Sequence, residues 1–506
     1  MACEDTPTLT ILLDRLVNAL LSMTSPQTAM FAMQSALVLW LALTVGSSVV
    51  AALILVPRAR RRSERRVDNW PNIGVIIPCY MPNEWEIIRG TIDAVGNSAY
   101  PGEMCIHVPF NGNTPDVDFE LPSEANGRTV FGYSVDGSRS KAANATQALS
   151  SLPEGVSIVV IFDADHHPTH DTVEQLVRVL INSPPECVCA QGAVLPVRGD
   201  ASLTTCWLKW LVSGMEYTGW RFYIPGVALL NGSAWFAGAN AAWRRKDLED
   251  LELSTDAVTE DIEVSIRAML TGRHMCLAPW AVVEELCPPS FMIFVRQRLR
   301  WALGWEQATF KHFCSVLKTR KRALVLLFSR YINVAAGLFA VINLITRLLD
   351  FVNAQKSPAG LPVMLLTSTA GYTGVVALLC ATLAAITDGE SIYRLLQIVT
   401  FMSMAPVFVV WQIYTFVRSW ATLLCCAVVW IPTTRTKNAV VHRIQMDKVT
   451  QKMPGRAVRV RLGTKHSRLA TVEEGPWENA PKNCLIWSAW HRGDSGHALD
   501  QGGSCE

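Results

Sequence analysis

Short apolar runs alternate with amphipathic segments between residues 72 and 317, and this alternation constrains the fold more than any other feature. The runs "IGVIIP", "MCIHVP", "TVFGYSV" and "SIVVIF" have the length and composition of buried strands. Residues 85–95 and 172–181, which lie between such runs, show helical periodicity. Strands that alternate with helices predict an α/β fold, with a mostly parallel sheet and helices on both faces. Such folds bind their ligands at the carboxyl ends of the strands.

Longer apolar runs lie on both sides of this region. Residues 33–56 form a run long enough to cross a bilayer, which takes roughly 20 residues. The sequence "RARRRSERR" follows at once, and the positive-inside rule places such a cluster, with the domain after it, in the cytosol. Only 17% of the residues are charged, against about 25% in a typical soluble protein, so we expect part of the chain in lipid. Further apolar runs follow the basic "KTRKR": residues 323–346, 363–386, 395–417 and 420–431.

The number of C-terminal spans stays open. Three spans would leave the tail outside, yet the tail is rich in lysine and arginine, and the positive-inside rule then favours an even number. Residues 395–431 are therefore expected to form either two tight spans or one span with a re-entrant helix.

These patterns divide the chain into five parts. In order, they are an interfacial segment with a transmembrane helix and a basic cytosolic linker, the α/β domain, interfacial helices, C-terminal transmembrane helices, and a polar cytosolic tail expected to be disordered: residues 1–66, 67–285, 286–322, 323–431 and 432–506. The net charge of +2 argues against a nucleic-acid partner, because domains that bind nucleic acid usually carry a strong basic excess.

Two carboxylates one residue apart follow the apolar run "SIVVIF". Asp163 and Asp165 would both emerge at the carboxyl end of a strand, where they can point into the same crevice. Carboxylate oxygens are the ligands that Mg²⁺ and Mn²⁺ prefer, typically together with substrate phosphates. The alternative is a loop that only turns at aspartate, and the position at a crevice favours the metal site.

The segment "AVTEDIEVSIRAMLTG" predicts a helix that begins near Thr259. Thr259 would be its N-cap, with Glu260 and Asp261 in the positively polarised first turn. This capping role alone would explain all three residues. In the other interpretation, the Asp261 carboxylate is a general base that removes the proton from an attacking hydroxyl. The spacing does not decide between the two.

Two further segments place cations beside small or aromatic residues. Lys141 lies near a predicted helix start in "SRSKAANATQAL", although a lone lysine on a helix is usually only solvated. In "QRLRW", Gln297 and Arg300 lie on one helical face, with Trp301 beside them. Arginine can bind a diphosphate through two parallel hydrogen bonds, and tryptophan offers a flat face to a sugar ring. Composition alone favours a membrane-interface helix with snorkelling arginines.

The order of six motifs resembles that of membrane-integrated family 2 glycosyltransferases of the cellulose, chitin and hyaluronan synthase type. The resemblance covers roughly residues 70–310 together with the flanking apolar runs, and its most specific part is the order of D-x-D, T-E-D and Q-x-x-R-W. The motifs are "PCYMPNE" (78–84), "SKAANA" (140–145), "DAD" (163–165), "FAGAN" (236–240), "TED" (259–261) and "QRLRW" (297–301).

The resemblance implies a GT-A fold that faces the cytosol and uses a nucleotide sugar, with Mg²⁺ or Mn²⁺ as the cofactor. It makes Asp261 the catalytic base and assigns the metal to Asp163 and Asp165. It places the acceptor against Trp301 and Glu260. The nucleotide-sugar contacts that it implies are Tyr80, Glu84, Asn111, Lys141, Asp163, Gln297 and Arg300. Many relatives carry aspartate at the place of Asn111, and a neutral amide can still hydrogen-bond uracil.

The same resemblance implies a reaction. An inverting transferase would move a sugar, expected to come from UDP-glucose, onto the hydroxyl of a growing polysaccharide, form β-linkages and translocate the polymer across the membrane. Transfer of a single sugar to a membrane lipid, as in ceramide glucosyltransferases, is the alternative. The expected partners are a UDP-sugar, a polysaccharide or lipid acceptor and the lipid bilayer, with a homo-oligomer or an accessory subunit left open. We expect a multi-pass protein of the plasma membrane or the Golgi, with its catalytic domain in the cytosol.

Overall fold

A computed structural model of the chain describes four long segments and several isolated positions. They are residues 64–114, 119–196, 207–319 and 392–425, with positions 43, 45–51, 60 and 457–458 and single residues between 323 and 390. The apolar runs 33–56, 323–346 and 363–386 lie largely outside the described residues, as does the tail after residue 425 apart from one short strand.

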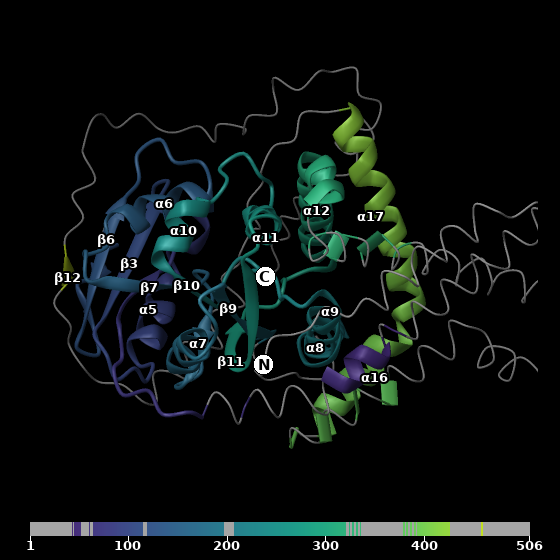
Figure 1. The fold of residues 1–506 in the computed structure, drawn as a ribbon, viewed down its shortest axis with the longest axis horizontal. Helices are drawn as coiled ribbons and strands as arrows, with labels where there is room; N and C mark the ends of the chain where they lie inside the picture. The colour runs from purple at the N-terminus through teal and green to yellow at the C-terminus, as the bar shows by residue number, and fades with distance from the viewer. Residues whose placement is uncertain are drawn as a thin grey trace, which may run out of the picture.

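A ten-stranded sheet forms the centre of the α/β domain (Figure 1). The strands follow the order β5-β6-β3-β1-β7-β10-β9-β11-β8, and β2 pairs with β3. Their bounds are β1 (Asn72–Ile76), β2 (Cys79–Tyr80), β3 (Met104–Asn111), β5 (Glu124–Ala125), β6 (Arg128–Ser134), β7 (Val156–Ile161), β8 (His167–Pro168), β9 (Cys187–Pro196), β10 (Ala241–Arg244) and β11 (His274–Glu285). A separate antiparallel pair joins β4 (Leu121–Pro122) to β12 (Ala457–Val458).

The sheet is mixed and mostly parallel, as the sequence predicts, and β10 is the main exception. Strands β6, β3, β1 and β7 run parallel to one another, and β9 runs parallel to β11. Strand β10 runs antiparallel between β7 and β9, with Ala241 opposite both Ile161 and Gln191. Since Ile161 is the last residue of β7, the chain enters β10 at the carboxyl edge of the sheet. The segment "FAGAN" just before β10 is thereby held at that edge.

Helices cover both faces of the sheet, also as predicted. Successive residues of a strand point to opposite faces, so Ile158 and Val160 of β7 join one hydrophobic cluster and Val159 and Ile161 join the other. Helices α5 (Ile88–Gly96) and α7 (Thr172–Ile181) close the first cluster. Helices α6 (Lys141–Ser150), α10 (Arg245–Leu251) and α11 (Glu260–Leu270) close the second. Figure 1 shows α6 and α10 on the opposite side of the strands from α5 and α7.

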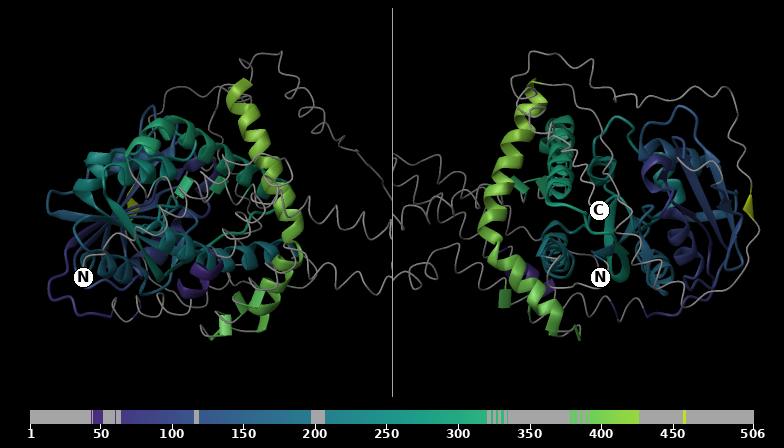
Figure 2. Two further views of the ribbon diagram at one scale, coloured as in Figure 1. Left: turned by 45° about the vertical axis from the view of Figure 1, so that its right-hand side comes forward. Right: turned by 180° about the vertical axis from the view of Figure 1, so that it is seen from behind.

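A second group of helices packs beyond the carboxyl edge of the sheet. It consists of α8 (Trp207–Thr218), the π-helical turn η2 (Gly219–Tyr223), α9 (Ile224–Asn231), α12 (Phe291–Thr319), α16 (Ile392–Ser403) and α17 (Ala405–Cys425). In Figure 1 and in the right-hand view of Figure 2, α17 lies on the side of the molecule opposite β6. Two glycines permit close contacts of this group, one within it and one with the start of α11. A Cβ on Gly214 of α8 would lie 2.1 Å from the Gln397 carbonyl of α16, and one on Gly304 of α12 would lie 2.2 Å from Thr259 Oγ1.

The C-terminal helices differ in part from the sequence prediction. Where interfacial helices were predicted over 286–322, the described residues 286–319 contain one helix, α12. The predicted span 395–417 does not form one helix, because α16 ends at Ser403 and α17 begins at Ala405. Pro406 has no backbone N–H to continue the earlier helix and suits the first turn of a new one. None of the helices within the described part of the chain combines the length and apolarity that crossing a bilayer requires.

Candidate active site

One cavity of about 340 Å³ lies at the carboxyl edge of the sheet, between the strand ends and helices α11 and α12. Its walls come from segments that are far apart in the sequence, because parallel strands end at a common edge. All of the residues proposed from the sequence line it: Tyr80, Glu84, Asn111, Lys141, Asp163, Asp165, Glu260, Asp261, Gln297, Arg300 and Trp301.

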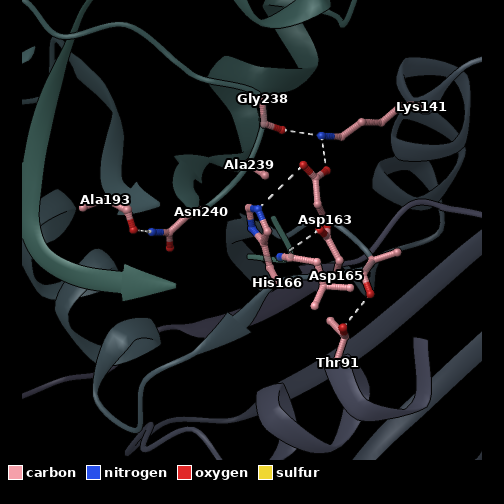
Figure 3. A network of polar contacts seen from close by, with 12 residues as sticks. Thr91, Lys141, Asp163, Asp165, His166, Ala193, Gly238, Ala239 and Asn240 are labelled. Atoms are coloured by element: carbon pink, nitrogen blue, oxygen red, sulfur yellow. Dashed lines mark hydrogen bonds and ion pairs between the residues drawn. The ribbon is translucent and has the colours of Figure 1, made fainter. Parts of the chain in front are cut away.

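A cluster of three possible metal ligands follows β7. Ligand atoms of Asp163, Asp165 and His166 all lie within 4.8 Å of one another (Figure 3). His166 Nε2 lies 3.8 Å from Asp163 Oδ2, and the backbone N–H of Leu286 donates to Asp165 Oδ2 at 3.3 Å. Asp165 and His166 are almost fully buried. Two carboxylates and an imidazole held this way suit Mg²⁺ or, with the nitrogen ligand, Mn²⁺.

Lys141 connects this cluster to the segment "FAGAN". Its ammonium donates to Asp163 Oδ1 and, at 2.8 Å, to the carbonyl of Gly238 (Figure 3). Burial alone would lower the pKa of Lys141, but the carboxylates of Asp163, Glu260 and Asp261 more than offset this, and the pKa is raised. The lysine therefore stays charged in the cavity. It begins α6, where the Ser140 hydroxyl accepts a hydrogen bond from the backbone N–H of Ala143.

Gly238 has a backbone conformation that L-residues rarely adopt, with φ of +91°. A Cβ at this position would lie 3.2 Å from Asp261 Oδ2 and 3.7 Å from Lys141 Nζ. The side chain of Asn240 holds the segment in place by donating to the carbonyls of Ala193 and Ala281, at 2.8 and 2.9 Å. Glycine thus lets the backbone pass directly beside both charged groups.

Asp261 lies in the first turn of α11, at the cavity wall. Burial, followed by the neighbouring charge of Glu260, raises the pKa of Asp261 to about 7, against the counteracting backbone N–H of Ile262, Lys141 and Arg300. The Ile262 N–H donates to Asp261 Oδ1 at 2.8 Å. Such a carboxyl can accept and release a proton near neutral pH.

The capping interpretation of this segment is only partly correct. Thr259 occupies the N-cap position, and acidic residues fill the first turn, as predicted. The Thr259 hydroxyl, however, makes no capping hydrogen bond, and its Oγ1 is buried without a hydrogen-bond partner among the described residues. It lies against α12 at Gly304. A capping hydrogen bond therefore does not account for Thr259.

Aromatic rings line another part of the cavity. Trp301 and Trp305 of α12 reach it together with Trp220 and Trp235. The rings of Trp235 and Trp305 meet edge to face, with 6.4 Å between their centroids. The guanidinium of Arg298 lies 4.2 Å from the centroid of the Trp301 ring. Flat apolar faces next to charged groups are the surface on which a sugar ring can stack and also form hydrogen bonds.

Asn111 at the end of β3 is held by two protein partners. Its Oδ1 accepts a hydrogen bond from Asn144 Nδ2 at 2.8 Å, and its Nδ2 donates to the Ser138 carbonyl at 3.2 Å. An aspartate here would set a carboxylate oxygen against that carbonyl, so this arrangement needs the amide. Nearby, Tyr80 is the N-cap residue of the short helix α4 (Met81–Glu84), and its backbone N–H donates to Glu84 Oε2 at 2.8 Å.

Several cavity residues were not among those proposed from the sequence. His166 stands directly after the D-x-D aspartates, so its position was the available signal. Arg298 lies inside "QRLRW" and Gly238 inside "FAGAN", but neither had an assigned role. Glu216 and Trp220 lie in α8 and η2, where nothing in the local sequence points to a site.

Comparison with known proteins matches this region to one family. Residues 71–304 match the sequence model of the glycosyltransferase-like family 2, which is slightly less than half of the 506-residue chain. "Probable glycosyltransferase YdaM" of Bacillus subtilis is 26% identical over 283 residues, covering 52% of this chain and 63% of that protein. "Probable glucomannan 4-beta-mannosyltransferase 14" of Arabidopsis thaliana is 26% identical over 269 residues, covering 51% and 49%.

A further relative is the poly-β-1,6-N-acetyl-D-glucosamine synthase of Staphylococcus epidermidis, 24% identical over 282 residues, which are 53% of this chain and 63% of that protein. The chain thus spans about half to just under two thirds of the length of these relatives. Among solved structures, the mannosyltransferase PcManGT from Pyrobaculum calidifontis, in complex with GDP-Man and Mn²⁺, is similar with a TM-score of 0.43 and 19% identity. The similarity covers 71% of this chain and 100% of that one.

Proposed function

We propose, on the premise that residues 71–304 form a family 2 glycosyltransferase domain, that this chain is an inverting glycosyltransferase that uses a nucleotide sugar and a divalent cation. One observation carries the proposal. A carboxyl with a pKa of about 7, Asp261, shares a cavity with a buried cluster of metal ligands and with the charged Lys141. A proton acceptor and an anion-stabilising group in one cavity are what glycosyl transfer from a diphosphate requires.

The cation would be held by Asp163, Asp165 and His166. Bound there, Mg²⁺ or Mn²⁺ would neutralise negative charge on the diphosphate as it leaves. Lys141 lies beside Asp163 and supplies a second positive charge. Arg300 lines the same cavity, and its positive charge acts on Asp261 by lowering the pKa of that carboxyl. These two cations favour the departure of the anionic nucleoside diphosphate.

The proton balance of the reaction passes through Asp261. The acceptor hydroxyl oxygen forms a bond to the anomeric carbon of the sugar while the bond from that carbon to the diphosphate breaks. The bonding electron pair leaves with the diphosphate, and the hydroxyl proton moves to the Asp261 carboxylate. Attack from the face opposite the leaving group inverts the anomeric centre, so an α-linked donor yields a β-linkage. Gln297, Trp301 and Glu260 would orient the donor and the acceptor.

The proposed acceptor is a growing polysaccharide, and the proposed donor is UDP-glucose. Two of the relatives are described as a glucomannan mannosyltransferase and a poly-N-acetylglucosamine synthase, which supports polymer synthesis. Exposed apolar side chains support a location of the helical group at a bilayer, through which the polymer would pass. They lie on α12, α16 and α17: Phe310, Phe313, Leu317, Ile392, Leu396, Val399, Val407, Val410 and Val417.

The test supplies membranes that contain the full chain with radiolabelled UDP-glucose, UDP-N-acetylglucosamine or GDP-mannose and either Mg²⁺ or Mn²⁺. A labelled product of high molecular weight that a β-glycosidase degrades, and that Asp261→Asn does not make, would establish a polysaccharide synthase. Label confined to an organic-extractable lipid would replace the polymer by a lipid acceptor. Folded protein that releases no nucleotide with any donor would overturn the proposal.

The metal assignment has its own test. Asp165→Ala and His166→Ala should weaken Mn²⁺ binding in the full chain, measured by electron paramagnetic resonance of the free ion. The matched control is His170→Ala, since His170 is an exposed histidine of the same region that does not line the cavity. Unchanged Mn²⁺ affinity in both variants would contradict the assignment.

A further inference from the structure

The two cavity arginines of "QRLRW" approach the cavity from different sides of α12. Arg298 and Arg300 are two residues apart, which places them about 200° apart around a helix. The charge of Arg300 acts on Asp261 and lowers its pKa. Arg298 instead forms an ion pair with Glu216 of α8. Only Arg300 is therefore placed to serve the reacting groups.

Arg298 lies between an aromatic ring and a carboxylate. Its guanidinium lies 4.2 Å from the centroid of Trp301 and 5.1 Å from that of Phe294. Its Nη2 donates to Glu216 Oε1. The side chains of Arg298 and Glu216 are only 20% and 14% exposed, so bulk water screens this pair weakly. Glu216, Arg298 and Trp301 all line the cavity.

We propose that Arg298 and Glu216 form a clamp that holds the indole of Trp301 in position for an acceptor saccharide. Arg298 is then a positioning residue, and the ligand class is a chain of pyranose rings. The inference rests on the proposed function, because it takes Trp301 as the acceptor surface. It goes beyond that function by assigning Arg298 and Glu216 to acceptor binding rather than to the diphosphate.

Stacking explains why the clamp would orient the ring. A guanidinium over an indole occupies one face of the ring, so a sugar can stack only on the opposite face. The ion pair with Glu216 fixes the plane of the guanidinium and hence the plane of the indole. It also connects α12 to the α8–η2 segment, which contributes Trp220 to the same cavity. A π-helical turn such as η2 is often found at functional sites.

Lysine cannot replace arginine in such a clamp. Its ammonium is a compact, strongly hydrated charge that neither stacks flat on an indole nor forms a planar fork. Arg298→Lys should therefore keep the ion pair with Glu216 but release the ring. If Arg298 served only to join α8 to α12, this variant would behave like the wild type.

The experiment measures the affinities for two ligands separately, on the full chain in membranes or detergent. The probes are UDP with Mn²⁺, for the donor side, and β-1,4-linked tetrasaccharides of glucose or N-acetylglucosamine, for the acceptor side. We expect Arg298→Lys and Glu216→Gln to weaken tetrasaccharide binding about tenfold, as expected for a lost cation–π contact, with UDP affinity unchanged. The matched control is Arg296→Lys, because Arg296 is an exposed arginine one half-turn away that does not line the cavity.

The outcomes separate this inference from the function beneath it. Wild-type protein that binds neither UDP nor any nucleotide sugar would overturn the proposed function. Wild-type protein that binds UDP but neither tetrasaccharide would overturn the clamp alone. Equal losses of UDP and tetrasaccharide affinity in both variants would also overturn it, since a merely structural role would act on both sites.

Discussion

The first turn of α11 has two sides, and their carboxylates behave in opposite ways. Asp261 faces the cavity, and burial together with the charge of Glu260 raises its pKa to about 7. Glu263, two residues further on, faces α12. Burial would raise its pKa too, but contacts with His312, Arg267 and Lys311 lower it to about 2. His312 Nε2 lies 2.8 Å from Glu263 Oε1.

Both carboxylates experience the same positive end of the same helix, so the helix dipole does not decide the difference. The partners that face each side chain decide it. Glu263 is 1% exposed and has three cationic or ionisable partners, which makes it an anchor between α11 and α12. Asp261 has a carboxylate neighbour, Glu260, and its Oδ1 accepts a hydrogen bond from a backbone N–H rather than from a cationic side chain. One side of the turn can exchange a proton, and the other stabilises the helix pair.

Asp261→Asn should give the largest effect. The amide cannot take up the acceptor proton, so turnover should fall about a thousandfold, in the range for loss of a general base. UDP affinity and the free energy of unfolding should not fall, because the amide removes a repulsion with Glu260. The measurements are steady-state turnover, UDP binding and thermal unfolding.

The control for this variant is Asp256→Asn, which changes an exposed aspartate just before α11. Retained turnover in Asp261→Asn would remove the catalytic distinction between the two sides of the turn.

Glu263→Gln should have the opposite effect. Loss of the charge leaves His312, Arg267 and Lys311 without their shared partner, and the free energy of unfolding should fall by about 3 kcal/mol, as for a broken buried ion pair. Turnover per folded molecule should be retained, since Glu263 does not line the cavity. Chemical denaturation and turnover on the folded fraction measure the two quantities. A Glu263→Gln variant that is stable but inactive would show that Glu263, the anchor, also serves the reaction in which Asp261 is the base.

The pH dependence of turnover and of stability should distinguish Asp261 from Glu263 further. Turnover requires the Asp261 carboxylate, so it should rise about tenfold between pH 6 and pH 8, with a midpoint near 7. The contributions of the two groups to stability have opposite signs. Because the pKa of Asp261 is above its usual 3.8, the folded state binds more protons, and this contribution declines as pH rises from about 4 to 7.

For Glu263 the folded pKa lies below its usual 4.5, so its contribution is present above that pH and is lost as pH falls toward 2. Unfolding midpoints of the wild type, Asp261→Asn and Glu263→Gln across pH 3 to 8 would measure both slopes. A pH-independent turnover between 6 and 8 would contradict the role of Asp261.

Glu260→Gln should give the smallest effect and the sharpest comparison. Removing the neighbouring charge eliminates the second cause of the raised pKa of Asp261, so the midpoint of the turnover profile should move to lower pH by about one unit. The profile is measured at saturating acceptor, since Glu260 lines the cavity. A midpoint that stays in place would show that burial alone raises the pKa.

Much of the fold and the membership of the site follow from local sequence. The helix predicted at residues 172–181 has these bounds in α7, because helical periodicity depends on neighbours three and four residues away. Strand β3 ends at Asn111 and β7 ends at Ile161, two residues before Asp163, and parallel strands end at one edge. This is why residues chosen from separate motifs line one cavity.

Other properties depend on contacts between distant segments. Strand β10 runs antiparallel because its chain enters at the carboxyl edge, and no pattern within "AAWR" specifies a direction. The pairing of Arg298 with Glu216 joins residues 82 apart in the sequence. The pKa of Asp261 depends on its burial and on Lys141 and Arg300, which fold in from other elements.

The sequence by itself therefore determined which elements form and which chemical groups gather at the edge of the sheet. Only the tertiary structure decided which carboxylate of α11 titrates near neutral pH and which arginine of α12 faces the reacting groups. The physical reason is the range over which each effect acts. Periodicity is a property of near neighbours along the chain, whereas burial and charge interactions sum over everything within several ångströms in space.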